Sequence, residues 1–149
     1  MSTTDTDLFR SVREEQFSIG TIVDDKPVTG ILYPDFEAKQ LPNGKIRAAD
    51  VTLSADKEWV EHLGGTSLFD KANVFKSKGW LCFPIPEGTE VPESLTIRHT
   101  GYNSLFKAEH YQIESAAQKM RVDAYKGALD NLARNAVVRS IELASVSSK

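Results

Sequence analysis

The sequence predicts an α+β fold in which a mixed or antiparallel sheet precedes one long C-terminal helix. Three observations support this prediction. Residues 80–85 form a continuous apolar run, residues 95–100 and 110–114 alternate between apolar and polar side chains, and residues 115–147 keep apolar residues at helical spacing. Because the strands come before the helix and do not alternate with helices, the order does not fit a doubly wound parallel sheet.

Length and composition are those of a single globular domain that spans residues 1–149. Apolar residues make up 40% of the chain and charged residues 26%, which is ordinary for such a domain. Residues 1–6 are polar, and we expect them to be poorly ordered. The net charge of −3 and the lack of a basic run give no argument for a nucleic-acid partner.

Targeting, disulfide and metal-binding signals are weak. No apolar stretch approaches the roughly 20 residues of a membrane span, and the first residues lack the basic region and apolar core of a signal peptide. Cys82 is the single cysteine, and its apolar surroundings favour a small buried side chain over a nucleophile. The three histidines are scattered without ligand spacing, so we expect no metal site.

The first half of the chain predicts short elements separated by turns. Residues 8–12 fit a strand that places Arg10 either at a solvent-exposed edge or facing a cleft, where a planar guanidinium suits a pyrophosphate. Residues 24–50 are rich in turn formers, and only residues 28–33 resemble a strand. We expect a short helix over residues 54–60, with Ser54 as its N-cap.

The segment from His62 to Asp70 contains two glycines, Thr66 and Ser67, followed by apolar residues that fit a short helix. The glycines allow the backbone to turn sharply and to approach a ligand closely. The two hydroxyls lie side by side in the sequence. The segment therefore has two interpretations: a ligand cradle, or an ordinary helix start in which Ser or Thr is the N-cap.

The C-terminal helix is the clearest element of the sequence, and we expect it over residues 115–147. Asp130 and Arg134 are spaced to form an i, i+4 ion pair on its surface. Gly127 lowers helix propensity and indicates a close approach of the helix to the sheet. The residues predicted on its buried face are Tyr125, Ala128, Leu129, Leu132 and Ala136.

Polar residues in one particular order suggest an enzyme class. The chain has no Gly-x-Ser-x-Gly, Walker or Rossmann pattern. It does have Arg10 on an early strand, Thr66 and Ser67 at a turn, and Gln112 and Glu114 on a late strand. An arginine, a Ser-Thr-type segment and Gln-x-Glu in this order are typical of ADP-ribosyltransferases of the Arg-Ser-Glu class.

The chemistry of that class explains the choice of residue types. Arg10 would hold the phosphates of the cofactor through charge-assisted hydrogen bonds, and the hydroxyls would orient the glutamate. Glu114 would stabilise positive charge as the nicotinamide–ribose bond breaks. In the alternative interpretation, Glu114 is an exposed carboxylate at the end of a strand that caps the following helix.

A wider resemblance supports this class. Residues 64–72, 85–92 and 129–136, with Tyr102-Asn103 and His110-Tyr111, resemble a toxin family that type VI secretion systems deliver between bacteria. The similarity is good from about residue 64 to the end, and in the earlier part of the chain it rests mainly on residues 8–12. It implies an ADP-ribosyltransferase-like fold, with a split mixed or antiparallel sheet and a long C-terminal helix.

The resemblance also implies an activity and partners. It implies a toxin that enters the recipient cytoplasm without a signal peptide, a cognate immunity protein in the producing cell, and a component of the secretion apparatus as carrier. NAD would be the substrate, with ADP-ribose passed to an unknown target. NAD hydrolysis, killing by binding without chemistry, and a housekeeping domain of the same architecture are the alternatives.

The resemblance further implies roles for individual residues. The catalytic residues would be Arg10, Ser67 and Glu114. The residues that bind the cofactor would be Arg10, Gly65, Thr66, Ser67, His110 and Gln112.

Overall fold

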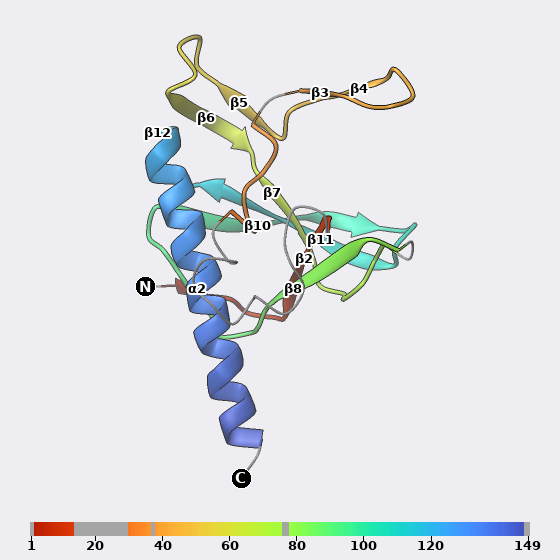
Figure 1. Cartoon of the computed structure of the whole chain (residues 1–149). Coiled ribbons are helices and arrows are strands. Elements are labelled where there is room, and N and C mark those ends of the chain that lie inside the picture. Colours follow the sequence, from red (N-terminus) through yellow and green to blue (C-terminus); the bar gives the residue numbers. More distant parts are fainter. Residues whose placement is uncertain (1, 14–29, 37, 76–77, 148–149) are drawn as a thin grey trace.

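The computed structural model describes residues 2–13, 30–36, 38–75 and 78–147, and it has the predicted α+β architecture (Figure 1). The largest sheet has five strands, and every neighbouring pair is antiparallel. In spatial order its strands are β10 (Leu95–Asn103), β11 (Ala108–Ser115), β7 (Thr66–Phe69), β2 (Leu8–Arg13) and β8 (Trp80–Ile85).

A second sheet of three strands branches from the first, again with antiparallel pairs only. Its strands in spatial order are β12 (Lys119–Arg121), β6 (Trp59–Gly64) and β5 (Val51–Leu53). Because β6 ends at Gly64 and β7 begins at Thr66, one segment of chain belongs to both sheets. The strands are therefore divided between two sheets, and Gly65 lies at the junction.

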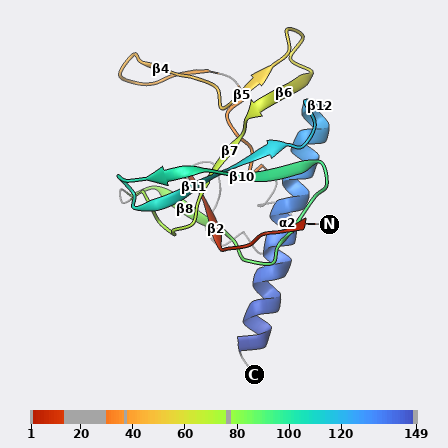
Figure 2. The same cartoon turned by 180° about the vertical axis from the view of Figure 1, so that it is seen from behind.

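Two short ribbons complete the described strands. β1 (Ser2–Thr3) pairs with β9 (Glu90–Val91), and β3 (Lys39–Gln40) pairs with β4 (Ile46–Arg47). The β3–β4 ribbon extends away from the body of the molecule, at the same end as β5 and β6 (Figure 2). We expected residues 1–6 to be poorly ordered, whereas β1 is paired and the buried Thr4 hydroxyl donates to the main-chain oxygen of Pro86, 2.8 Å away.

The long C-terminal helix of the prediction is confirmed as α2 (Val122–Ser147), which contacts β6, β8, β9 and β12. It begins later than residue 115 because residues 119–121 pair with β6. Its last turns extend beyond the sheets (Figures 1 and 2). The predicted core positions Tyr125, Leu129, Leu132 and Ala136 are fully buried, and Ala128 is 7% exposed.

Two expectations about the surface of this helix are wrong. Asp130 does not pair with Arg134; it accepts hydrogen bonds from the Gly30 N–H and the Tyr33 hydroxyl, both at 2.8 Å. The Arg134 guanidinium donates to Asn131 instead. Gly127 makes no close approach to the sheet, because a Cβ added there would meet nothing within 4 Å.

Three local predictions in the first half are also corrected. Residues 66–69 form strand β7 and not the start of a helix, because strands β11 and β2 flank them on both sides. Residues 54–58 form the turn of the β5–β6 hairpin, closed by the Ser54 N–H, which donates to the Trp59 oxygen at 2.9 Å. We expected a strand over residues 28–33. Residues 30–33 instead include a turn, and residues 28–29 lie outside the described residues.

The register gives the five-stranded sheet two distinct faces. Leu8, Val12, Leu68 and Ile113 point to the core and are at least 95% buried. The residues that alternate with them along each strand lie on the opposite face, which we call the outer face. The outer face carries Phe9, Ser67, Phe69, His110, Gln112 and Glu114.

Candidate functional site

Three neighbouring strands place their polar residues in one row on the outer face. Gln112 of β11 is paired with Ser67 of β7 on one side and with Arg98 of β10 on the other. Residues directly opposite one another in antiparallel strands project from the same face. Glu114, two residues beyond Gln112 on β11, also projects from this face. The sheet thus brings together three of the predicted site residues: Ser67, Gln112 and Glu114.

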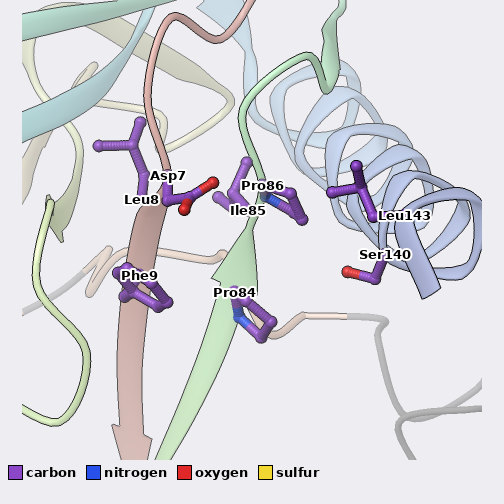
Figure 3. A pocket seen from close by; sticks show the side chains of 8 residues that line it. All are labelled: Asp7, Leu8, Phe9, Pro84, Ile85, Pro86, Ser140 and Leu143. Carbon is purple, nitrogen blue, oxygen red and sulfur yellow. The ribbon is translucent and has the colours of Figure 1, made fainter. Parts of the chain in front are cut away.

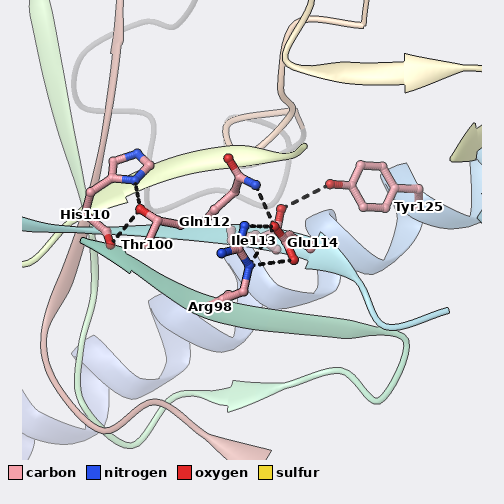
Figure 4. Close-up of polar contacts among 7 residues, drawn as sticks. All are labelled: Arg98, Thr100, His110, Gln112, Ile113, Glu114 and Tyr125. Atoms are coloured by element: carbon pink, nitrogen blue, oxygen red, sulfur yellow. Dashed lines mark hydrogen bonds and ion pairs between the residues drawn. The ribbon is translucent and has the colours of Figure 1, made fainter. Parts of the chain in front are cut away.

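Glu114 is the most enclosed of these side chains, with 3% of its side chain exposed. Its Oε2 accepts a hydrogen bond from the Gln112 amide at 2.6 Å and one from Nη2 of Arg98 at 2.8 Å (Figure 4). Nε of Arg98 lies 3.2 and 3.1 Å from the two carboxylate oxygens. The alternative interpretation of Glu114 as an exposed helix cap is therefore wrong, since the carboxylate is buried and α2 begins at Val122.

His110 lies further along the same face, where Thr100 contacts it from β10. The Thr100 hydroxyl lies 3.1 Å from the main-chain oxygen of His110, and the same hydroxyl contacts Nδ1 of the ring (Figure 4). Burial lowers the pKa of His110, which favours the neutral ring. A neutral imidazole has one N–H donor and one acceptor nitrogen, so the ring can both donate and accept a hydrogen bond.

Arg10 occupies the place where β2 and β7 separate. The two strands share one ladder pair, Phe9 with Phe69, and Arg10 follows directly. Its guanidinium donates to the main-chain oxygens of Ser67 at 3.3 Å and Tyr33 at 3.2 Å. Arg10 is thus neither a solvent-facing edge residue nor on the outer face, since it alternates with Phe9. It joins β2 to β7 and to the turn at residues 30–33.

Gly65 and Thr66 lie behind the row, in contact with the backbone. A Cβ added to Gly65 would lie 1.8 Å from the main-chain oxygen of Ile113, so only glycine fits between β7 and β11. The Thr66 side chain is fully buried, and its hydroxyl donates to the main-chain oxygen of Leu32 at 2.5 Å. In this structure the two residues hold the backbone that carries Ser67.

Sequence reasoning missed Arg98 and Thr100, the partners of Glu114 and His110. Both belong to a segment that was correctly predicted to be a strand. Alternation alone could not show which β11 residue each one faces. The missing signal was the register of the β10–β11 hairpin, which is shifted by an irregularity between His99 and Gly101.

Two cavities lie elsewhere on the molecule. One, of about 280 Å³, is bounded by β2, β8 and the end of α2, and it includes Phe9, Pro84 and Leu143 (Figure 3). The other, of about 310 Å³, lies between the N-terminal segment and the sheet and includes Asp5 and Tyr111. Neither is lined by Ser67, Gln112 or Glu114, so the row on the outer face is a separate feature.

The described ranges, residues 2–13, 30–36, 38–75 and 78–147, contain no candidate metal site and no candidate membrane-spanning helix. Within them, no three His, Cys, Asp or Glu side chains are grouped so that they could hold a metal ion. No helix in the described part of the chain is both long and apolar enough to cross a membrane.

Two comparisons with known proteins relate the chain to one family. A family model described as Tse2 ADP-ribosyltransferase toxin matches residues 4–141, which include every strand from β2 to β12 and most of α2. Toxin Tse2 of Pseudomonas aeruginosa is 36% identical over 117 residues, or 78% of this chain and 73% of the relative. The resemblance found in the sequence is thereby confirmed, and the chain belongs to the Tse2 ADP-ribosyltransferase toxin family.

Proposed function

We propose that this chain is an antibacterial effector toxin that uses NAD as a substrate and transfers ADP-ribose to a target in the recipient cytoplasm. Membership of the Tse2 family supports this proposal at the level of the whole chain. The structural observation that carries it is the row on the outer face, where Ser67 and Gln112 adjoin a buried carboxylate, Glu114. Two branching antiparallel sheets with a C-terminal helix also fit an ADP-ribosyltransferase-like fold.

In the proposed reaction Glu114 stabilises the positive charge that develops on the ribose as nicotinamide leaves. A carboxylate held in a fixed orientation at low exposure is well suited to this role, because charges interact more strongly away from water. Gln112 fixes one oxygen of that carboxylate through its 2.6 Å hydrogen bond, and we assign it to the orientation of the acceptor group. Ser67, opposite Gln112, would orient the ribose through its hydroxyl.

His110 and Arg10 have supporting roles in this proposal. The imidazole of His110, two residues along β11 from Gln112, can form a hydrogen bond with a hydroxyl of the substrate. Arg10 fixes the position of Ser67 through the main-chain hydrogen bond. Contacts of Arg10 with the phosphates of NAD, and of Gly65 and Thr66 with NAD, remain predictions from the sequence.

One observation favours a second candidate, a toxin that kills by binding without chemistry. The carboxylate of Glu114 is engaged by Arg98 through contacts of 2.8 to 3.2 Å. In this second candidate the Arg98–Glu114 pair would stabilise the sheet without taking part in a reaction, and the fold would present a surface to a target. NAD hydrolysis, with water as the acceptor, is the nearest alternative within the enzymatic proposal.

The test uses the purified chain, lysate of a susceptible bacterium, and NAD labelled in its adenylate phosphate. Transfer predicts release of nicotinamide together with label on a protein or nucleic-acid band. Hydrolysis predicts release of nicotinamide and labelled free ADP-ribose. Toxicity in cells without any nicotinamide release in lysate would contradict the enzymatic proposal and favour the binder.

Delivery and neutralisation belong to the same proposal. We infer from the family that a secretion apparatus, of type VI by the resemblance, delivers the chain into the recipient cytoplasm and that an immunity protein protects the producing cell. Expression of the chain in the cytoplasm of a susceptible bacterium should then be toxic. Harmless cytoplasmic expression combined with toxic periplasmic expression would contradict the proposed site of action.

A further inference from the structure

An arginine with no role in the proposed mechanism lies against the carboxylate on which that mechanism depends. Arg98 projects from β10 opposite Gln112, and its guanidinium reaches along the outer face to Glu114 (Figure 4). Nε and Nη2 both lie within hydrogen-bond distance of the carboxylate, the shortest contact being 2.8 Å. Two neighbouring N–H groups directed at one carboxylate form the fork geometry that arginine provides and lysine does not.

The two partners of this ion pair differ strongly in exposure. The side chain of Arg98 is 53% exposed, whereas that of Glu114 is 3% exposed. A carboxylate removed from water loses its charge unless a partner compensates for the lost hydration. An arginine that is half in solvent keeps most of its own hydration. The pair therefore benefits the charged form of Glu114 far more than it benefits Arg98.

Two of the described residues near the carboxylate, Gln112 and Tyr125, have neutral side chains. Gln112 contributes a neutral amide from β11. On the side of α2 lies Tyr125, whose hydroxyl donates to the main-chain oxygen of Ile113 at 3.3 Å. Burial, with the negative charges of Glu114 and Asp50, raises the pKa of Tyr125, so its phenol stays protonated. Hydrogen bonds from Arg98 to the carboxylate raise the pKa of Arg98 in turn.

We propose that Arg98 is a positioning residue that keeps Glu114 charged and fixes the orientation of its carboxylate. This inference rests on the proposed function, in which Glu114 must be ionised to stabilise positive charge on the ribose. The Arg98 side chain makes two distinct contributions in this proposal. The positive charge controls the ionisation of Glu114, and the planar fork controls the direction of the carboxylate.

The two contributions predict different effects on the pH dependence of the reaction. Loss of an adjacent positive charge raises the pKa of a buried carboxylate, because a group that stabilises the charged form against burial is then missing. The acid limb of kcat for NAD consumption should therefore move to higher pH in Arg98→Gln. Arg98→Lys keeps the charge and loses the fork, so its acid limb should stay near that of the wild type while kcat falls.

The experiment measures nicotinamide release from NAD over about pH 4.5 to 8, the range in which a glutamate with an ordinary or raised pKa titrates. The matched control is Arg121→Gln. Arg121 is 51% exposed and pairs with Asp123 at 3.7 Å, but that carboxylate is itself 85% exposed. In parallel, the carboxyl of Glu114 is titrated by ¹³C NMR in each variant and assigned through Glu114→Gln.

We expect the acid limb and the NMR midpoint of Glu114 to rise by about one pH unit or more in Arg98→Gln, a typical effect of removing an adjacent arginine. Neither should move in Arg121→Gln. An unchanged NMR midpoint in folded Arg98→Gln would overturn the inference. If that variant does not fold, Arg98→Lys decides: wild-type kcat and an unchanged carboxylate chemical shift would overturn it.

The proposed function and this inference can fail separately. A wild-type chain that releases no nicotinamide refutes the enzymatic function, and the NMR titration alone then decides whether Arg98 keeps Glu114 charged. An active chain in which the acid limb of Arg98→Gln stays in place refutes the inference and leaves the function intact.

Discussion

The guanidinium of Arg10 donates a hydrogen bond to the main-chain oxygen of Ser67, 3.3 Å away, where strands β2 and β7 separate. A second hydrogen bond from the same group reaches the main-chain oxygen of Tyr33 at 3.2 Å. One side chain thus joins two strands and a turn, at a place where the strands are too far apart for a regular ladder. The contact supports the main chain at Ser67, which is also paired with Gln112 on β11.

Replacement of Arg10 by alanine should therefore lower stability as well as activity. Hydrogen bonds from a charged donor contribute about 1.5–3 kcal/mol, and part of this should be lost from the free energy of unfolding. Urea unfolding of the purified variant measures the loss. Arg13→Ala is the control, because Arg13 lies on the same strand, is exposed, and stacks over Trp80 at 4.6 Å. Equal stability of the two variants would contradict the joining role of Arg10.

The junction between the two sheets gives a second prediction, in which two glycines behave oppositely. Gly65→Ala places a methyl group 1.8 Å from the main-chain oxygen of Ile113, so β7 must move away from β11. We expect the free energy of unfolding to fall by about 1–3 kcal/mol or more, as for overpacked cores. Gly127→Ala meets nothing within 4 Å and should stabilise α2 by up to about 1 kcal/mol. Thermal unfolding of both variants checks the signs.

The difference between prediction and structure at residues 66–69 has a physical cause. Thr66 and Leu68 are buried between β11 and β2, and their strand conformation follows from pairing with segments far away in the sequence. A run of four residues carries too little periodicity to separate a strand from the first turn of a helix. The same limit applies to Ser54, since residues that cap helices also close hairpin turns.

The elements that were predicted correctly are those with long, regular patterns. Strand β8 shows a continuous apolar run, β10 and β11 alternate over five residues or more, and helix α2 keeps apolar residues at helical spacing. The site was predicted in part for the same reason. Gln112 and Glu114 lie on a strand with clear alternation, so their common face followed from the sequence. Arg98 required the register between two strands, which periodicity does not contain.

Tyr33 and Asp130 connect the turn at residues 30–33 to α2 and give a third prediction, about alkaline pH. Burial, the hydrogen bond to Asp130 and the charge of Asp130 raise the pKa of Tyr33 to about 12. The unfolded chain releases this proton near pH 10, so the favourable contribution is complete below pH 10 and is lost between about pH 10 and 12. Urea midpoints should therefore fall more steeply over this range in the wild type than in Tyr33→Phe.

The control for this prediction is Tyr102→Phe, which changes a tyrosine that is 61% exposed at the β10–β11 hairpin. Its urea midpoints should follow those of the wild type. Tyr111 and Tyr125 also have raised pKa values, but they are present in all three proteins and cancel in the comparison. Parallel curves for the wild type and Tyr33→Phe would show that the contact with Asp130 does not stabilise the neutral phenol.

The last prediction concerns Glu114→Gln, which keeps the shape of the side chain and removes its charge. Loss of one preorganised charged group lowers kcat by about 10² to 10³, and we expect NAD consumption to fall by that factor. The free energy of unfolding should change little, because Arg98 is 53% exposed and can be hydrated when its partner is neutral. Glu109→Gln is the matched control, since Glu109 is a half-exposed residue of the same strand that contacts His99.

The combination of variants separates chemistry from binding. If Glu114 acts in the reaction, Glu114→Gln loses both NAD consumption and toxicity while its thermal midpoint stays near that of Glu109→Gln. A folded Glu114→Gln chain that remains as toxic as the wild type, beside a folded and harmless Ser67→Ala chain, would show that the outer face acts by binding. Under that result the Arg98–Glu114 pair would be part of the scaffold, and Ser67 would contact the target directly.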